Sequence, residues 1–495
     1  MFPSMLSFLC ASLLAGPALA QEDGDVKTDS QSDSEMPSET EQSDAEVESA
    51  SATEAEASET ESAAAESAEN SAAAESTESS ELLATAAGAE TVAEVHNYEP
   101  PSPLPSLNNL LPLPSWMSLE AGYVAEPFIV PGDSGVMVNY AQGVEMASQF
   151  STGFGYDDAA KWLEQDHWIL TLDVQQYNDT GDLGGDMGVV NSPQEISNPA
   201  GLYLGEVSIT RDPGNGWLYF KMGSISMDAD FLSPEAPGYY TNASFNNQYN
   251  VSMEVFPISP MIANGAVFGA HLDKGLNLKT GVYQLSSIRT DGDKKGWDWS
   301  SSADDGVVGL FQASMPIGHD DELSICPPDD HTFSRHASDC GDDHVFNELP
   351  GGRWQVGGFV SQYDFLDGGS SQGNHGAYAN VTLPVPLPIG AGHRVWFSGV
   401  YGFQPVINPM PAWAGAGWMS QGLLNSRPLD LMLLGLSWSQ LSLDELEQRE
   451  IVLEMDYILV LTDTISLQPT VQYFLDTPSE LSLPLAVGLG IHAGL

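Results

Sequence analysis

Basic residues are scarce in this chain of 495 residues: 14 lysines and arginines stand against 69 aspartates and glutamates, for a formal net charge of −55. So few cations argue against a nucleic-acid partner, because a phosphate backbone is bound mainly by lysine and arginine. The balance fits a protein bathed in salt, where acidic surfaces stay hydrated and their self-repulsion is screened.

Long apolar runs are also missing. After the first twenty residues, no segment has about eighteen uninterrupted apolar residues, so the sequence predicts no transmembrane helix. A membrane location therefore requires a closed β-barrel, in which the backbone polar groups are paired between strands.

The linear motifs of metal and nucleotide chemistry are absent as well. The sequence has no H-E-x-x-H motif and no Gly-rich phosphate loop, so we expect no cofactor and no enzymatic activity. A barrel with an enzymatic or adhesive role stays open as an alternative, because side chains on adjacent strands can form a site without a linear motif.

The first 115 residues have the composition of export and spacer segments. Residues 1–20 run through an apolar stretch to Ala18 and Ala20, as in a secretory signal peptide, although no basic residue precedes that stretch. Residues 21–100 contain 23 acidic residues and one basic residue, Lys27, and can bury too little to offset chain entropy, so we expect disorder. Residues 101–115 are Pro-rich and form a stiff boundary. The acidic segment carries −22, which leaves −33 for residues 116–495.

The end of the chain gives the clearest strand signal. From Leu485 to Leu495 every odd position is apolar and the positions between are small or polar, which is the period of a strand with one apolar face. Such a strand, rising about 3.3 Å per residue, covers a tilted path through the hydrocarbon layer of a membrane. We interpret it as the closing strand of a membrane barrel. From this stretch alone, a half-buried strand of a soluble sandwich is the alternative.

The same alternation recurs over almost 380 residues, for example at 117–123, 168–175, 218–223 and 451–461. Candidate strands number about fifteen or sixteen, so an even sixteen is predicted, and a barrel of that size leaves an aqueous channel. The predicted fold class is therefore all-β: a transmembrane antiparallel β-barrel over residues 116–495, preceded by a disordered acidic segment.

The links between these strands differ in length. Short links at 273–275 and 462–464 contrast with long Gly/Asp/Ser-rich stretches at 178–200, 287–305, 318–350 and 403–427. Outer-membrane barrels have short periplasmic turns and long external loops, so we assign the long stretches to the outer side.

An ordered series of segments resembles a known family, the carbohydrate-selective porins of the OprB type. The segments are GLYLGEVSITRDPGNGWLYFKMGSISMDADF (201–231), YYTNASFNN (239–247), LNLKTGVYQ (276–284) and ISLQPTVQYFLDTP (465–478). The resemblance covers residues 112–495. It implies a sixteen-stranded barrel in the outer membrane of a Gram-negative bacterium, through which sugars such as glucose diffuse down their gradient.

Two features depart from the family. The last residue is Leu495, where such barrels usually end in phenylalanine, which bears on recognition by the barrel assembly machinery. Arginine is also far scarcer than the family's pore eyelets imply. The expected partners are outer-membrane lipid, sugars as permeants and the assembly machinery, with no nucleic acid. A homo-oligomer is compatible with this reasoning but is not required by it.

Candidate pore-lining residues come from the alternation and from the resemblance. A neutral sugar needs hydrogen-bonding groups and aromatic faces along a narrow wet path. The alternation turns several polar positions inward, and the resemblance implies that the segment after Ser226 folds into the pore. For each residue the alternative is an ordinary polar residue of the wall or loop. The candidates are Asp173, Gln175, Glu206, Ser208, Tyr219 and Lys221 on strands, and Asp230, Asn242, Ser244, Asn246 and Asn247 in the loop.

Lys221 is notable because cations are scarce. It either builds the transverse field of a pore eyelet or belongs to an ordinary ion pair in the lumen. Cys326 and Cys340 bracket a polar stretch, and in an oxidising compartment they are expected to form a disulfide worth about 3 kcal/mol. Three histidines nearby permit a metal-site reading, but their spacing matches no standard zinc pattern, so we expect no metal.

The favoured hypothesis is a passive sugar-permeable porin. A mainly cation-selective porin is the second hypothesis, motivated by the acidic barrel region and the scarcity of arginine.

Overall fold

The computed structural model describes residues 111, 113–114, 116–132, 135–151, 167–212, 217–232, 234–246, 256–272, 275–317, 349–363, 373–390, 392–405, 407–424, 426–443, 446–462, 464–478 and 484–494. All of them belong to one compact unit, Ala93–Leu495. The predicted signal peptide, the acidic segment and the two cysteines Cys326 and Cys340 lie outside the described residues.

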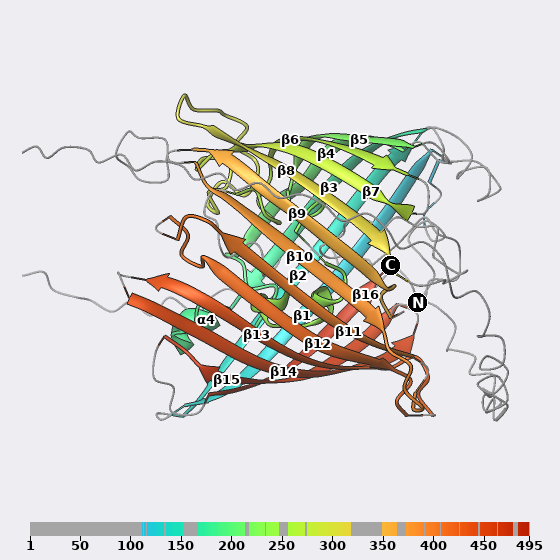
Figure 1. Ribbon diagram of the computed structural model, residues 1–495, viewed down its shortest axis with the longest axis vertical. Coiled ribbons are helices and arrows are strands. Elements are labelled where there is room, and N and C mark those ends of the chain that lie inside the picture. Colours follow the sequence, from blue (N-terminus) through green and yellow to red (C-terminus); the bar gives the residue numbers. More distant parts are fainter. Residues whose placement is uncertain are drawn as a thin grey trace, which may run out of the picture. The chain divides into compact units, whose positions relative to one another are not determined.

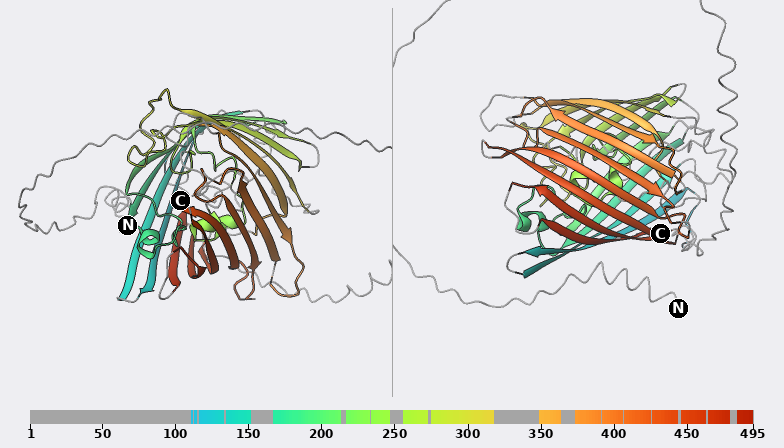
Figure 2. Two further views of the ribbon diagram at one scale, coloured as in Figure 1. Left: turned by 60° about the vertical axis from the view of Figure 1, so that its left-hand side comes forward. Right: turned by 60° about the horizontal axis from the view of Figure 1, so that its bottom comes forward.

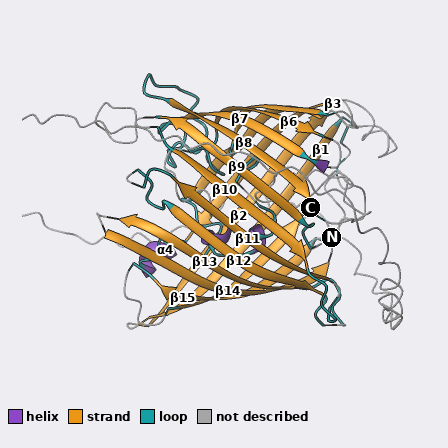
Figure 3. Cartoon of the chain, in the orientation of Figure 1, coloured by secondary structure: helices purple, strands orange, loops and turns teal. Residues whose placement is uncertain are grey.

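Sixteen antiparallel strands close into a barrel, each pairing with its neighbours in sequence and β1 pairing with β16 (Figure 1). The prediction of a sixteen-stranded antiparallel barrel is confirmed. Figure 3 shows how little helix accompanies these strands. The elements are β1 (Met117–Gly132), β2 (Gly135–Ser151), β3 (His167–Asp179), α4 (Leu183–Met187), β4 (Gly201–Asp212), β5 (Leu218–Ile225), η1 (Pro237–Tyr239), α5 (Ala243–Asn246), β6 (Ala263–His271), β7 (Asn277–Leu285), β8 (Gly306–Pro316), β9 (Arg353–Gln362), β10 (His375–Pro384), β11 (Gly392–Gly402), β12 (Ala412–Gln421), β13 (Leu431–Leu443), β14 (Leu446–Thr462), β15 (Ile465–Asp476) and β16 (Leu485–Gly494).

Alternation along the strands determines which side chains face outward. On β3 the exposed Trp168, Leu170 and Leu172 alternate with inward positions, as a strand with one lipid-facing side requires. On β16 the exposed Val487 faces outward, whereas Ala486 and the glycines beside it are buried. The period-two prediction is confirmed for both strands.

Exposed aromatic residues gather near both ends of the barrel. β16 runs from Leu485 to Gly494, and we name the two barrel ends after these residues. Trp116, Trp168 and Trp217 lie near strand starts at the Gly494 end, and Tyr401 and Phe403 lie at the Leu485 end. Such aromatic girdles are typical of barrels that cross a membrane. Among the described residues, no helix is long and apolar enough to cross a membrane.

Strand order corrects two of the predicted links. Because β8 ends and β9 begins at the Gly494 end, the stretch 318–350 does not join the same barrel end as 178–200 and 287–305. The stretch 403–427 is not one loop, since it contains β12. Composition identifies a long link but not the barrel end at which it lies. That end depends on whether an odd or an even number of strands precedes the link.

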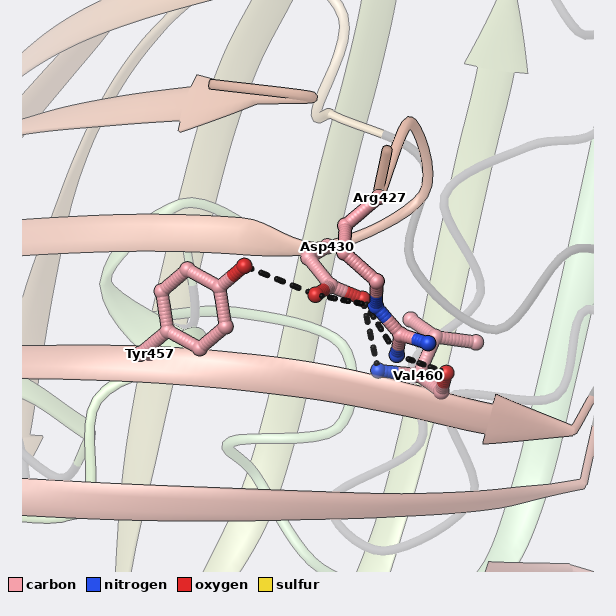
Figure 4. Close-up of polar contacts among 4 residues, drawn as sticks. All are labelled: Arg427, Asp430, Tyr457 and Val460. Carbon is pink, nitrogen blue, oxygen red and sulfur yellow. Dashed lines mark hydrogen bonds and ion pairs between the residues drawn. The ribbon is translucent and has the colours of Figure 1, made fainter. Parts of the chain in front are cut away.

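A polar cluster closes the β13–β14 pair at the Gly494 end (Figure 4). Asp430, in the link between β12 and β13, is buried and accepts hydrogen bonds from Arg427 Nε at 2.9 Å, Tyr457 Oη at 2.7 Å and Val460 N at 3.0 Å. Arg427 Nη2 also donates to the Val460 carbonyl at 2.5 Å. The cluster therefore satisfies both backbone polar groups of Val460 where the ladder between β13 and β14 ends.

Replacing Asp430 with asparagine is expected to lower the free energy of unfolding by about 2–3 kcal/mol, because it weakens several charge-assisted hydrogen bonds at a buried site. Asp476→Asn provides the control: Asp476 pairs with Arg449 at an exposed position, where an ion pair contributes less than about 1 kcal/mol. Denaturant midpoints of the two variants in detergent micelles would test this. Equal shifts of the denaturant midpoint in Asp430→Asn and Asp476→Asn would contradict the stabilising role of the Asp430 cluster.

Candidate functional site

Two loops fold from the Leu485 end into the barrel. They are the β3–β4 loop (residues 180–200), which carries α4, and the β5–β6 loop (residues 226–262), which carries η1 and α5. In Figure 2 the helical turns of the β5–β6 loop lie inside the ring of strands, beside the red strands of the C-terminal part. We call these two loops together the inner loop layer.

The β5–β6 loop leaves the wall at β5 and reaches strands on the other side of the barrel. Glu454 on β14 accepts hydrogen bonds from Thr241 N at 2.7 Å, Thr241 Oγ1 at 2.9 Å and Asn242 N at 3.0 Å. On β15, Gln472 accepts from Asn242 Nδ2 at 3.0 Å. The hydroxyls of Ser244 and Ser437 lie 2.7 Å apart. The loop therefore crosses the lumen and binds the wall through its own backbone.

Aromatic rings fix the same loop to β11, β12 and β13. Tyr240 stacks on Phe245 with ring centroids 4.7 Å apart, and Trp396 meets the Tyr240 ring edge-on at 5.6 Å. Tyr240 Oη donates to the carbonyl of Leu434 at 3.0 Å and accepts from Trp396 Nε1 at 3.2 Å. Burial raises the pKa of the Tyr240 phenol well above its usual value, so the hydroxyl stays a donor.

A pair of glycines makes room for these rings. Gly417 on β12 and Gly435 on β13 stand directly opposite each other in the ladder. A Cβ at Gly417 would lie 2.5 Å from Tyr240 Oη, and one at Gly435 would lie 2.6 Å from Tyr240 Cε1. The missing side chains therefore create the hollow in which Tyr240 lies.

The β3–β4 loop binds the wall in a similar way. Glu450 on β14 accepts hydrogen bonds from Val190 N at 2.8 Å, Asn191 N at 3.0 Å and Asn191 Nδ2 at 2.6 Å. Glu126 on β1 accepts from Ile196 N at 3.3 Å. The composition of this stretch predicts an external loop, but these contacts bring it inside the barrel.

The two loops also contact each other. Ala243 N donates to the carbonyl of Ser192 at 2.9 Å. Gln472 Nε2 bridges both loops, since it donates to the carbonyl of Pro193 at 2.9 Å and to Thr241 Oγ1 at 3.0 Å. The inner loop layer is thus one connected unit on the wall of β11 to β15.

On the wall of β3, β4 and β5, polar residues point inward. We call Asp173, Gln175, Glu206, Tyr219 and Lys221 the polar stripe. Lys221 Nζ lies 3.0 Å from Glu206 Oε2 and 3.7 Å from Asp230 Oδ2, and all three side chains are buried or nearly so. Asp230 belongs to the β5–β6 loop, so Lys221 ties the start of that loop to the strand from which it departs.

The β3 part of the stripe is internally hydrogen-bonded. Gln175 Nε2 donates to Asp173 Oδ2 at 2.7 Å and Tyr177 Oη donates to Gln175 Oε1 at 2.9 Å. On β4, Ser208 donates to Glu206. Asp173 and Gln175 are buried, whereas Glu206 and Tyr219 keep part of their surface exposed.

The structure separates the predicted site residues into two groups. Glu206, Lys221 and Asp230 come together, with Asp173, Gln175 and Tyr219 on the same wall. Asn242 lies instead on the opposite wall, fully buried against Gln472. The side chain of Asn246 and all of Asn247 lie outside the described residues. Contact of any of these residues with a sugar stays a prediction.

Sequence reasoning missed three features of the site. Lys279 on β7 lies on the inward side, alternating with the exposed Leu278 and Val282, so the same alternation would have found it. Its Nζ lies 6.0 Å from the centre of the Tyr219 ring. Glu450 and Glu454 also lie on an inward face, but nothing in the sequence reveals which loops they hold.

Two further loop residues are buried ionisable groups, Asp228 and Arg289. Burial raises the pKa of Asp228 above its usual value, partly offset by the hydrogen bond from Ser259 N at 3.0 Å. Burial lowers the pKa of Arg289, whose guanidinium donates to the Asp298 carbonyl at 2.8 Å and to Ser224. Among the described residues, no group of three or more histidine, cysteine or acidic side chains is placed to hold a metal ion.

Comparison with known proteins gives one family. The family model described as carbohydrate-selective porin, OprB family, matches residues 158–480. No curated protein is similar at a significant level.

Among the solved structures compared, one of Pseudomonas putida OprB supports the same fold. The chain is similar to a high-pH structure of Pseudomonas putida OprB, with a TM-score of 0.61 and 14% identity over 77% of this chain and 94% of that one. A low-pH structure of Pseudomonas putida OprB has a TM-score of 0.45 and 12% identity, over 77% and 93% of the two chains. A mutant of Rh. blastica porin has a TM-score of 0.39 and 10% identity, over 77% and 100%.

Proposed function

We propose that this protein, which belongs to the OprB family of carbohydrate-selective porins, selects its permeants between the inner loop layer and the polar stripe. It is a sugar-selective outer-membrane porin with a β-barrel channel, and a channel rather than an enzyme. We call the passage between these two groups of residues the constriction.

The observation that carries this proposal is the path of the β5–β6 loop. It starts beside Lys221 on β5 and is bound to Glu454 on β14 and Gln472 on β15, so it narrows the lumen from inside. A solute in the barrel must pass the edge of this loop. A short narrow zone of this kind discriminates between solutes because hydration is exchanged there for contacts with protein.

The chemistry of the polar stripe suits a polyhydroxyl solute. In the stripe, Glu206 accepts hydrogen bonds and Tyr219 offers both a hydroxyl group and a ring face, and Lys279 on β7, beside the Tyr219 ring, donates hydrogen bonds. The buried Asp173 and Gln175 hold their neighbours in place through the bonds described above. A sugar can therefore exchange water contacts for protein contacts at the half-buried members of the stripe without being held tightly.

Osmotic swelling of vesicles tests the proposal. Purified protein is inserted into liposomes, and entry of glucose, of a disaccharide and of an uncharged non-sugar solute of the size of glucose is compared. We expect glucose to enter faster than the size-matched solute. Rates that follow size alone would contradict selection by hydroxyl contacts.

Cation selectivity is a second candidate property. Acidic side chains at inward strand positions outnumber basic ones: the acidic residues include Glu126, Glu145, Asp173, Glu206, Glu450, Glu454 and Asp456, and the basic residues include Lys221, Lys279, Arg353 and Arg394. A negative lumen attracts cations and repels anions. Many of these carboxylates are engaged by the loops, so we expect moderate selectivity, and reversal potentials in a salt gradient should favour cations. A potential near zero would contradict this expectation.

The finer aspects of export and assembly are part of the same proposal. Residues 1–20 serve as a signal peptide, and the barrel assembly machinery inserts residues 116–495 into the outer membrane of a Gram-negative bacterium. The acidic residues 21–100 and the Pro-rich residues 101–115 form a spacer. The two inner loops enter from the Leu485 end, which faces outward, and the Gly494 end faces the periplasm, although it also carries the long link 317–352. Cys326 and Cys340 form a disulfide, and a homo-oligomer is compatible with this assembly but not required by it.

A further inference from the structure

We propose that Glu450 and Glu454 are the positioning residues that set the width of the constriction, by holding the backbone of the inner loop layer against β14. This inference rests on the proposed function, because it assigns the size limit of that same passage to two residues that no solute needs to touch.

Both carboxylates hold the loops through backbone hydrogen bonds. Each binds a loop through two consecutive backbone N–H groups, Val190 and Asn191 for Glu450 and Thr241 and Asn242 for Glu454. A backbone N–H cannot rotate away as a side chain can. Two such bonds on the two oxygens of one carboxylate therefore fix the orientation of the loop as well as its position.

Burying these two carboxylates is unfavourable unless other groups replace their hydration. Both carboxylates are buried, Glu450 at 1% and Glu454 at 0% exposure, and no lysine or arginine pairs with either of them among the described residues. A buried carboxylate is tolerated only when hydrogen bonds replace its lost hydration. Without the loops these two groups would lack those partners, so the docked arrangement is the one that the wall favours.

Both carboxylates also lie on one strand. Glu450 and Glu454 are four residues apart on the inward face of β14, which places them about 13 Å apart along the strand. One holds the β3–β4 loop and the other holds the β5–β6 loop, and Gln472 on the neighbouring strand bridges both. A single strand thus binds both loops through two of its carboxylates.

The test replaces the acceptors without changing their size. In Glu454→Gln, either orientation of the amide places an NH₂ group against a backbone donor of Thr241 or Asn242. The same substitution at Glu145 is the matched control, because Glu145 is also a buried inward carboxylate, on β2, but receives none of the described loop N–H groups. Swelling rates are measured for a mono-, a di- and a trisaccharide.

For Glu454→Gln we expect the rate of trisaccharide entry relative to monosaccharide entry to rise roughly tenfold, because losing a charge-assisted hydrogen bond shifts a two-state equilibrium by about that factor. Glu450→Gln is expected to act in the same direction, and Glu145→Gln to leave the ratio unchanged. If the ratio of trisaccharide to monosaccharide entry is unchanged in folded Glu454→Gln and Glu450→Gln, the proposal is overturned.

An engineered disulfide between the β5–β6 loop and β13 distinguishes a displaced loop from general destabilisation of the Glu454→Gln variant. Ser244→Cys with Ser437→Cys, in a chain whose three cysteines are replaced by serine, places thiols where two hydroxyls now lie 2.7 Å apart. When this bond is formed in Glu454→Gln, we expect the original ratio to return, and to be lost again on reduction. Failure of the disulfide to restore the ratio would overturn the proposal, even if Glu454→Gln itself folds poorly.

The swelling rates test the positioning role of Glu450 and Glu454 separately from the proposed selection of sugars. If glucose and its size-matched non-sugar solute enter at equal rates, selection by hydroxyl contacts fails, while the size limit can still respond to Glu454→Gln. If glucose is preferred but the size limit ignores Glu450 and Glu454, only the positioning role fails.

Discussion

Replacing Lys221 with methionine is expected to lower the free energy of unfolding by about 3–5 kcal/mol, the cost of breaking a buried ion pair from one side. Lys221 Nζ lies 3.0 Å from Glu206 Oε2 and 3.7 Å from Asp230 Oδ2. Neither carboxylate oxygen of Asp230 has a hydrogen-bond partner, so the lysine is its main compensation. Without the lysine, Asp230 would be a buried charge at the start of the β5–β6 loop.

Denaturant midpoints in detergent micelles measure this effect, and the double variant Lys221→Met with Asp230→Asn is its control. Because the double variant removes the stranded charge together with its partner, it should recover part of the lost stability. Reversal potentials should shift toward cations in Lys221→Met, since a positive group leaves the lumen. A loss below about 1 kcal/mol would show that the pair behaves like an exposed one.

Replacing Gly435 with valine is expected to narrow the constriction. Its Cβ would lie 2.6 Å from Tyr240 Cε1 and 2.9 Å from Phe245 Cε1, and Trp396 packs against both rings. The rings have to move away from the wall, which displaces the β5–β6 loop toward the lumen at an overpacking cost of about 1–3 kcal/mol. An added barrier of about 1 kcal/mol for a disaccharide slows its entry about fivefold.

Gly122→Val is the matched control for this substitution. Gly122 also lies in a strand that lines the barrel, but a Cβ there would meet its nearest neighbour, Glu145 Cβ, at 4.0 Å. Disaccharide entry and single-channel conductance should fall in Gly435→Val and stay unchanged in Gly122→Val. Equal rates in both folded variants would show that the hollow under Tyr240 does not determine loop position.

The barrel was predictable from the sequence because period-two alternation is a local property. The odd positions of β16 and the exposed Trp168, Leu170 and Leu172 of β3 were placed correctly without any knowledge of neighbouring strands. The count of sixteen followed from repeating the same signal. The end of the barrel at which a link lies is not local, however, and the stretch 318–350 was therefore assigned to the wrong side.

The contacts that form the candidate site were harder to predict from the sequence. Alternation places Glu206 and Lys221 inward, but their pairing with Asp230 requires the loop to turn back onto β5. Asn242 and Glu454 are separated by more than two hundred residues and meet only because the loop crosses the lumen. Backbone N–H groups that bind Glu450 and Glu454 leave no mark in the sequence, since every residue except proline has one.

We propose that sugars are recognised at a constriction formed by the inner loop layer and the polar stripe. Recording the single-channel current while glucose is added tests this most directly. We expect a current that falls with glucose concentration and saturates, and that falls less in Tyr219→Ala, which lacks the ring and hydroxyl of that residue. A current that falls only as much as with a non-sugar solute of the same size, in both proteins, would contradict it.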